Sequence, residues 1–554
     1  MKGSHRRLEA LAVALALAFG MACSESSGDA LIARPQGLEA GEISFSADGD
    51  DTESPETMSD KWKEVDRLIS EDKFEAASGL AAQIREAARQ SGDDENWTRA
   101  LIKEVQLRTA LHGYETAVRF LRSEPWPETP VYGAILELFY AQALVSYIQI
   151  YSWEIEQRER FDTGDEIDLK SWTKQQIVEE AQKAHLEVWR QREVWGSESL
   201  GVLGEYLQQN NYPARIRGTL RDAVTYLWVE LLSDTSLWRP RQSNEQYRLN
   251  LESLIAGDPV GSAQIELDDP AVHPLVKIGA LLDDLESWHL ESDRPEAAFE
   301  ADRERLSRLH ASFSRADDRK AIRAGLEERL DVLGRRYPWW SVGQATLADQ
   351  VLVDDAADSQ MRARELALAG EQAHPGTIGG DRCRNIVAAI EAPGYSLQSM
   401  ANDGPARRSI QVTHKNLDTL HFRAYALDLV KQIESSEDYN ALPGYREVPE
   451  IISSRLPDAE WSVKLPATPD YRFHRTYVTP PMEKPGLYVV VASARRDFRQ
   501  AVNREAAVNL IVTDLVLLTR QLDSMLEVTV RSGETGRGLE RVEVSLYRFD
   551  YRKG

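Results

Sequence analysis

The stretch Ala392-Pro-Gly-Tyr395 separates two patterns of apolar residues in this chain of 554 residues. Before it, apolar side chains recur every three or four positions, which is typical of helices that bury one face. After it, they alternate with polar residues, as in half-buried β-strands. The Pro-Gly pair itself favours a turn. The sequence therefore predicts a multidomain chain that is α-helical first and antiparallel β second.

The helical domain is predicted over residues 59–392. Four apolar stripes at helical spacing support it: Trp62, Val65, Leu68 and Ile69; Ala181, Ala184, Val188 and Trp195; Leu220, Val224, Leu227 and Leu231; and Leu275, Ile278, Leu282 and Leu285. Breaks are expected at prolines, among them Trp238-Arg-Pro240 and Asp269-Pro270. The most apolar segment, residues 132–149, contains Glu137, Gln142 and Ser146. Because a spanning helix needs about 20 apolar residues, we interpret this segment as a buried helix.

Short similarities inside this region indicate helix pairs. Lys73-Phe-Glu-Ala-Ala77 and Gly113-Tyr-Glu-Thr-Ala117 stand 40 residues apart, and each opens an apolar-periodic segment. Trp62 and Trp97 stand 35 residues apart. The pattern is a loose helix-pair repeat, similar to a tetratricopeptide (TPR-like) array without its full signature. Stacked helix pairs often present a concave binding face, and an irregular helical domain without a ligand remains the alternative.

The β region is predicted to form an antiparallel β-sandwich over residues 395–515. Ile410 and Val412 alternate with polar residues, as do the apolar residues at 420, 422, 424 and 426, while residues 487–492 and 508–518 are apolar runs. Residues 516–554 contain two further alternating groups: Leu526, Val528 and Val530, then Val542, Val544 and Leu546. Two or three strands do not complete a sandwich. We therefore expect a second sandwich that is incomplete within these residues.

The N-terminus predicts export. Lys2, Arg6 and Arg7 precede the apolar run 10–21, which is too short to span a bilayer and is typical of a signal peptide over residues 1–22. Ala22 before Cys23 resembles a bacterial lipoprotein signal, which implies lipidation of Cys23. Ordinary signal cleavage with an incidental cysteine is the alternative. Ser24, rather than an aspartate, after the cysteine is similar to lipoproteins sorted to the outer membrane, so we expect a lipid-anchored envelope protein there, facing the periplasm.

Charge and composition narrow the partners. Residues 23–58 are acidic and poor in apolar side chains, so they are predicted to form a disordered tether between lipid and folded body. The whole chain has 90 acidic and 66 basic residues and a formal net charge of −24. Such a charge repels polynucleotides, and no nucleic-acid partner is expected. With two cysteines, Cys23 and Cys383, a disulfide framework is excluded.

Several stretches, in this order, resemble the N-terminal portion of a bacterial alpha-2-macroglobulin family protein. They are Asp60-Lys-Trp-Lys-Glu-Val-Asp, Tyr212-Pro-Ala-Arg-Ile-Arg-Gly-Thr-Leu-Arg-Asp-Ala-Val-Thr-Tyr-Leu, Gly380-Asp-Arg-Cys-Arg-Asn-Ile, Lys415-Asn-Leu-Asp-Thr-Leu-His-Phe-Arg-Ala-Tyr, Pro485-Gly-Leu-Tyr-Val-Val-Val-Ala-Ser and Val512-Thr-Asp-Leu. The resemblance implies macroglobulin-like β-sandwiches at 395–515 and 516–554. It also implies an endopeptidase inhibitor that traps proteases after cleavage of a bait segment, so that proteases are the expected partners.

The sequence departs from that family at its reactive centre. The family's thioester requires Cys-x-Glu-Gln, whereas Cys383 is followed by Arg-Asn-Ile and Cys23 by Ser-Glu-Ser. These 554 residues are therefore expected to supply anchor and scaffold without bait or thioester. A bait segment would lie beyond Gly554, and the chain is either a fragment or a truncated product that retains only the scaffold. The alternative hypothesis is an envelope-anchored helical-repeat scaffold that binds a protein or peptide.

No residue here predicts catalysis, a cofactor or a metal. Cys383 is interpreted as a buried structural thiol, with a reactive thiol near His374 as the alternative. His414 and His421, with Asp418 between them, could meet but lack metal-ligand spacing. The adjacent acids Asp283-Asp284 and Asp354-Asp355 are interpreted as solvated faces. Gly-x-Ser-x-Gly and P-loop motifs do not occur in the sequence. We therefore predict a protein that is not an enzyme.

Overall fold

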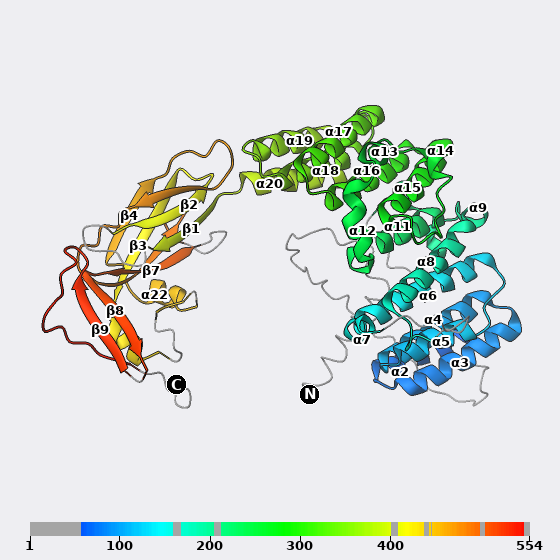
Figure 1. Cartoon of the computed structure of the whole chain (residues 1–554), viewed down its shortest axis with the longest axis horizontal. Helices are drawn as coiled ribbons and strands as arrows, with labels where there is room; N and C mark the ends of the chain where they lie inside the picture. Colours follow the sequence, from blue (N-terminus) through cyan, green and yellow to red (C-terminus); the bar gives the residue numbers. More distant parts are fainter. Residues whose placement is uncertain are drawn as a thin grey trace, which may run out of the picture. The chain divides into compact units, whose positions relative to one another are not determined.

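The computed structural model describes residues 57–158, 168–203, 206, 212–399, 408–436, 442–444, 446–498, 505–523 and 525–547. The predicted signal peptide, Cys23 and all but the last two residues of the predicted tether lie outside these residues. Helices come first and antiparallel sheets second along the chain (Figure 1). The chain divides into two compact units, residues 1–340 and 341–554, which are described separately below. The domain limits given above stay predictions.

The first unit is helical. Its helices are α2 (Met58–Ser70), α3 (Phe74–Ser91), α4 (Asp94–Ala110), α5 (Tyr114–Ser123), α6 (Pro130–Ile150), α7 (Ser152–Glu156), α8 (Lys174–Arg190), α9 (Arg192–Trp195), α10 (Ala214–Arg217), α11 (Leu220–Ser233), α12 (Pro240–Glu245), α13 (Leu251–Ala256), α14 (Pro259–Ser262), α15 (Pro274–Glu291), α16 (Pro295–Ser312) and α17 (Ala316–Leu333), with a 3₁₀ turn η2 (Thr235–Leu237) before α12. Neighbouring helices pack in succession, as α2 does on α3, α3 on α4, and α15 on α16.

The predicted apolar stripes lie on the buried faces of these helices. Leu275, Ile278, Leu282 and Leu285 are all buried in α15. The stripe that begins at Ala181 crosses a helix break, because α8 ends at Arg190 and Trp195 belongs to α9. Every member of that stripe is nevertheless buried. The helical spacing of apolar residues thus predicted the buried faces correctly, even where it did not predict a break between two helices.

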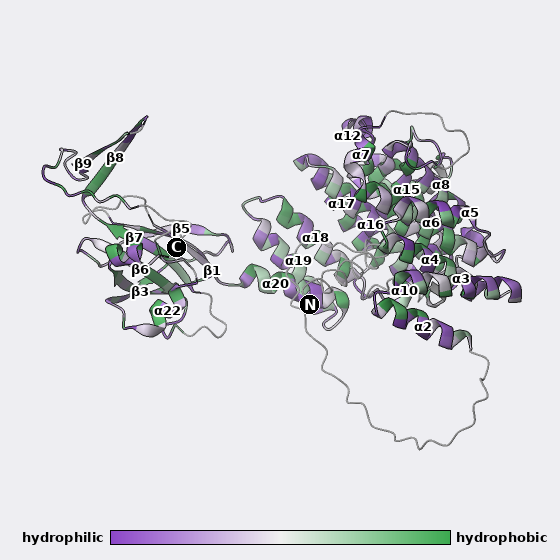
Figure 2. Cartoon of the chain, turned by 90° about the horizontal axis from the view of Figure 1, so that it is seen from below, coloured by the Kyte–Doolittle hydropathy of each residue, from purple (hydrophilic) through white to green (hydrophobic). Residues whose placement is uncertain are grey.

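Helix α6 contains the most apolar segment of the described chain. By length and composition it could cross a membrane, but 61% of its apolar window is buried inside the protein. It packs against α4, α5 and α8. Figure 2 colours the chain by hydropathy, and hydrophobic (green) segments recur along the helices of this unit. This burial agrees with the interpretation of a buried core helix.

One turn occurs three times with a non-glycine residue at its positive-φ position, and once more with a glycine, at Gly92-Asp93 between α3 and α4. The positive-φ residue follows the first helix of the pair, and the amide after it donates to the carbonyl five residues back at 2.9 Å. The three turns are Asp72-Lys73, His112-Gly113 and Asp293-Arg294, followed by Phe-Glu-Ala-Ala, Tyr-Glu-Thr-Ala and Pro-Glu-Ala-Ala. The geometry is that of a Schellman-type helix end. Two copies match the predicted helix openings, and the third was not predicted because Pro295 replaces the aromatic residue.

The second unit begins with helices and continues as sheets. Its elements are α18 (Trp340–Val353, whose first residue belongs to the first unit), α19 (Ser359–Ala373), α20 (Ile378–Glu391), β1 (Gly394–Ser399), β2 (Ile410–Lys415), β3 (Thr419–Leu427), α21 (Leu429–Glu434), α22 (Val448–Ser454), β4 (Ala459–Lys464), β5 (His474–Val478), β6 (Gly486–Ser493), β7 (Ala506–Val512), β8 (Leu515–Leu522) and β9 (Met525–Ser532).

Two antiparallel sheets share one hydrophobic core. Their strand orders are β1-β2-β5 and β4-β3-β6-β7. Val412 from the first sheet and Phe422 and Val490 from the second belong to the same buried cluster. The ring of Phe422 stacks on Trp461, its register partner on β4, with 5.0 Å between centroids. Two sheets facing each other across such a core form a sandwich.

The hairpin β8–β9 forms a separate two-stranded sheet. Two predictions about this part were wrong. The run 508–518 is two strands, because the chain breaks at Thr513-Asp514. Residues 542–546 form no strand: pairing with β9 begins at the Arg531–Gly538 bridge and stops after the Leu539 amide, which donates to Val530 at 3.0 Å. Many apolar hairpin side chains are exposed: Leu515, Leu517, Leu518, Leu522, Met525 and Leu526.

Candidate functional site

Cys383 lies on the buried face of α20. Its thiol donates to the backbone carbonyl of Ser341 at 3.3 Å. Burial raises the pKa of the Cys383 thiol to about 12. The neighbouring Arg382 pairs with Asp349 at 2.8 Å. A buried thiol with so high a pKa is a poor nucleophile, which agrees with the structural interpretation.

The two histidines considered as a pair belong to different sheets. His414 lies on β2, and its Nε2 and the Thr476 hydroxyl are 3.0 Å apart. His421 lies on β3 and hydrogen-bonds to Ser462 at 2.7 Å. Burial lowers the pKa of His414, with His474 adding to the effect. Asp418 uses its backbone carbonyl to accept from Leu465. Across the ranges described above, no group of three or more His, Cys, Asp or Glu residues could hold a metal.

The interpretation of Asp283-Asp284 as a solvated face was wrong. Asp283 is only 3% exposed and pairs with Arg305. Asp284 accepts from Arg192 at 2.9 Å and from Arg221 at 2.8 Å. Three arginines from distant segments thus supply the charge that makes this burial possible.

The second acid pair lies on a loop. Asp354 and Asp355 follow α18, and Asp355 is exposed, as interpreted from the sequence. Asp355 pairs with Arg472 at 2.9 Å. An exposed pair of this kind contributes little to stability.

A second buried cluster places two acids side by side on α15 and α16. Burial raises the pKa of Glu286 to about 8, and the nearby Asp302 carboxylate adds to this effect. Asp302 pairs with Arg305 and, at 3.1 Å, with Arg329. Burial and Asp302 thus both favour the protonated form of Glu286, whereas Arg305, 3.8 Å from its carboxylate, favours the charged form.

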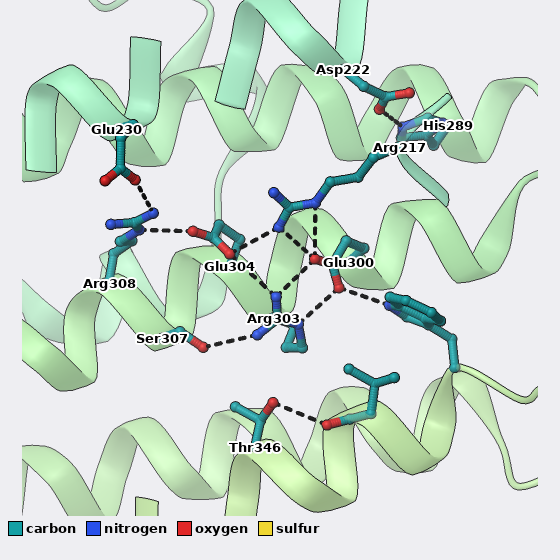
Figure 3. A network of polar contacts seen from close by, with 12 residues as sticks. Arg217, Asp222, Glu230, His289, Glu300, Arg303, Glu304, Ser307, Arg308 and Thr346 are labelled. Atoms are coloured by element: carbon teal, nitrogen blue, oxygen red, sulfur yellow. Dashed lines mark hydrogen bonds and ion pairs between the residues drawn. The ribbon is translucent and has the colours of Figure 1, made fainter. Parts of the chain in front are cut away.

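The densest buried ion network joins α10, α11 and α16 (Figure 3). Glu300 accepts from Arg217, from Arg303 at 2.7 Å and from the Trp339 indole at 2.7 Å. Glu304 accepts from Arg217 at 3.0 Å and from both Arg303 and Arg308. Burial opposes the charge on Glu300, but the arginines outweigh it and lower the Glu300 pKa to about 2. Each of these carboxylates is satisfied, so the network is a clamp between helices.

A pocket of about 190 Å³ opens between α8, the end of α11, α12 and the start of α15. Its walls are mainly apolar and include Leu231, Leu237, Trp238, Val272 and Pro274. The Trp238 indole donates to the Leu232 carbonyl at 2.7 Å and packs edge-on against His273. The ring is therefore fixed in place before any ligand arrives.

The charged side chains that line this pocket are mostly basic. Lys277 is 3% exposed, and its ammonium donates to the Leu267 carbonyl at 2.6 Å. Burial lowers the pKa of Lys277, while Asp269 and Asp268 oppose this effect. Arg239 pairs with Glu179, and Lys174 also lines the pocket. Three cationic side chains thus stand against one acid in the wall.

Sequence reasoning did not find this pocket. The two proline breaks, at residues 238–240 and 269–270, were predicted and form parts of its wall. The two breaks pack against α8 only in the folded protein, and the residues that form the pocket are spread over about a hundred positions of the sequence. A local sequence pattern does not indicate such a contact.

Comparison with known proteins gives one similar solved structure. No protein-family model matches the chain, and no curated protein sequence does. The similar structure is native alpha-2-macroglobulin from Escherichia coli spanning domains MG0-NIE-MG1, at a TM-score of 0.20 and 12% identity, covering 26% of this chain. The match spans 47% of that solved chain. A TM-score of 0.20 is too low to assign a shared fold.

Proposed function

We propose that this chain is the anchoring and scaffolding part of a cell-envelope endopeptidase inhibitor of the alpha-2-macroglobulin type. One observation carries the proposal: paired helices are followed by a two-sheet antiparallel sandwich and then by a further hairpin. This is the order that the sequence resemblance implies. Lipidation at Cys23 would hold the chain at the outer membrane, facing the periplasm, and proteases would be its partners.

In this proposal the chain positions a trap and performs no chemistry. A bait segment would be cut by the protease, and collapse around the enzyme would exclude large substrates. The helices and sandwich of this chain would carry that machinery away from the membrane. The buried thiol of Cys383, with its raised pKa, suits a structural role in such a scaffold.

Trapping can be tested with substrates of two sizes. The natural gene product that contains these residues is purified and incubated with a broad-specificity endopeptidase. We expect hydrolysis of casein to fall while hydrolysis of a small chromogenic peptide continues, because an enclosed protease stays accessible to small molecules. The 554-residue chain alone is the control and is expected to leave both activities unchanged. Unimpaired casein hydrolysis at excess gene product would refute the proposal.

The anchor is tested separately by fractionation of cells. Cys23→Ser is expected to move the protein from the membrane fraction to the soluble fraction, because the acylated residue is lost. Cys383→Ser is the matched control and is expected to stay with the membrane. Equal partitioning of the two variants would rule out the lipid anchor.

A second candidate function is an envelope scaffold whose helix pairs bind a protein or peptide. The three copies of one helix-ending turn favour it, because repeated helix pairs are a common architecture for such binding. The protease assay separates the two candidates, since a scaffold of this kind leaves casein hydrolysis unchanged.

A further inference from the structure

We propose that the pocket between α8, α12 and α15 binds the C-terminal residue of a polypeptide, with its apolar side chain against Trp238 and its carboxylate at Lys277 and Arg239. The inference goes beyond the inhibitor proposal and does not depend on it. It rests on the size of the pocket, on the position of its basic groups, and on the fixed apolar wall.

The basic side chains Lys277 and Arg239 favour a negatively charged ligand group. An ammonium offers three N–H donors, and among the described contacts Lys277 uses one, to the Leu267 carbonyl. Arg239 offers five N–H donors, and Glu179 is its acidic partner. A buried cation whose charged form is disfavoured by desolvation gains from an approaching carboxylate. The same wall is therefore suited to a negative group and unsuited to a positive one.

The size of the pocket limits the ligand to about one residue. Its volume of about 190 Å³ is below the roughly 300–1,000 Å³ of pockets that hold drug-sized ligands. Such a space accepts a single side chain with its backbone atoms and excludes a helix or a folded domain. The leucines, prolines and Trp238 around it favour an apolar side chain. Because Trp238 is held by the Leu232 carbonyl, binding costs little ordering of the wall.

A chain end fits these features better than an acidic side chain does. A C-terminal residue carries an apolar side chain and a carboxylate on the same Cα, whereas Asp or Glu has the carboxylate in place of the apolar group. Gln182 lines the same pocket and presents both a donor and an acceptor. That amide suits the peptide bond that precedes the last residue.

The proposal is tested by fluorescence anisotropy with the full 554-residue chain. The probes are fluorescein-Gly-Gly-Gly-Phe with a free carboxylate and the same peptide with a C-terminal amide. We expect the free acid to bind about tenfold tighter or more, the usual effect of hydrogen bonds to a charged group. Equal affinity of acid and amide, or no binding of either peptide up to about 1 mM, would overturn the proposal.

Competition with small acids distinguishes a chain end from a free carboxylic acid. N-acetylphenylalanine retains the last peptide bond, and 3-phenylpropionate lacks it. We expect the first to displace the probe at lower concentration. If 3-phenylpropionate competes equally well, the pocket recognises any apolar carboxylic acid, and the assignment to a chain end is wrong.

Variants place the binding in this pocket. Lys277→Met and Gln182→Glu are each expected to weaken binding of the free acid about tenfold or more, the first by removing the cation and the second by adding a like charge. Lys183→Met, on the exposed side of α8 with 64% of its side chain accessible, is the matched control. Thermal unfolding checks that each variant folds. If Lys277→Met fails to fold, Gln182→Glu still tests the site. Wild-type affinity in the folded pocket variants would refute the site.

Discussion

Replacing Glu300 by Gln should destabilise the helical unit more than any exposed charge change. Glu300 is the acceptor at the centre of the network in Figure 3, facing Arg217, Arg303 and the indole of Trp339. Gln keeps the shape but removes the charge. It also turns one acceptor atom into a donor, which then faces donors. Two buried guanidinium groups are left to share Glu304.

The expected cost follows from that imbalance. Breaking a buried ion pair by removing one partner costs roughly 3–5 kcal/mol, because the remaining charge stays desolvated. Glu300 serves two buried arginines at once, so we expect Glu300→Gln to fall within this range. Removing Arg303 as well, in Glu300→Gln with Arg303→Met, should cost less than the sum of the two single changes, since fewer charges are left unpaired.

Urea unfolding followed by tryptophan fluorescence measures this cost. Twelve of the thirteen tryptophans belong to residues 1–340, and Trp461 is the exception, so the signal reports on the helical unit. Glu64→Gln, which removes an exposed pair with Arg67, is the control and should give no measurable change. A loss below about 1 kcal/mol for Glu300→Gln, or additive costs in the double variant, would refute the view of the network as a clamp.

Three further predictions concern groups described above. Glu286 has a folded pKa of about 8 against an ordinary value of 4.5, so the unfolded chain releases this proton at lower pH than the folded protein does. The stability of the wild type should therefore fall between about pH 5 and pH 8 relative to that of Glu286→Gln. Urea midpoints that run parallel for the two proteins across that range would contradict this prediction. In a Cys23→Ser chain, Cys383 should react with a disulfide reagent at pH 8 only after urea is added. A thiol pKa of about 12 leaves roughly one molecule in 10⁴ with a thiolate at that pH. Rapid labelling of the native protein would contradict the burial of Cys383. Asp293→Gly should raise stability by up to about 1 kcal/mol, since Asp293 has φ of 53°, and a lowered melting temperature would show that its side chain has another role.

The parts of the fold that could be predicted are those that leave a local pattern. The stripe on α15 was predicted because burial of one face imposes its period on the sequence. Helix α6 and strand β6 were predicted as continuous apolar runs, because both are buried on more than one side. The third helix-ending turn has the same Glu-Ala-Ala start as the first, at residues 296–298, but Pro295 hid it from a search for the aromatic residue.

The parts that could not be predicted depend on partners far along the chain. Asp284 is held by Arg221 and Arg192, which lie 63 and 92 residues away, and nothing near the acid indicates them. The strand expected at residues 542–546 has suitable alternation, but the chain does not pair with β9 after Leu539, and alternation alone does not report pairing. The pocket around Lys277 is likewise a product of tertiary packing, although both of its proline breaks were visible in the sequence.

The hairpin β8–β9 has a practical consequence for handling this protein. Within the described residues β8 pairs with β9 alone, and Leu517 and Met525 are 55% and 67% exposed. A strand with an open edge and exposed leucines is a template for intermolecular cross-β pairing. Preparations of the 554-residue chain should therefore aggregate with rising concentration. A version that stops after β7, or one with Leu517→Lys, should stay monodisperse at concentrations where the parent chain precipitates.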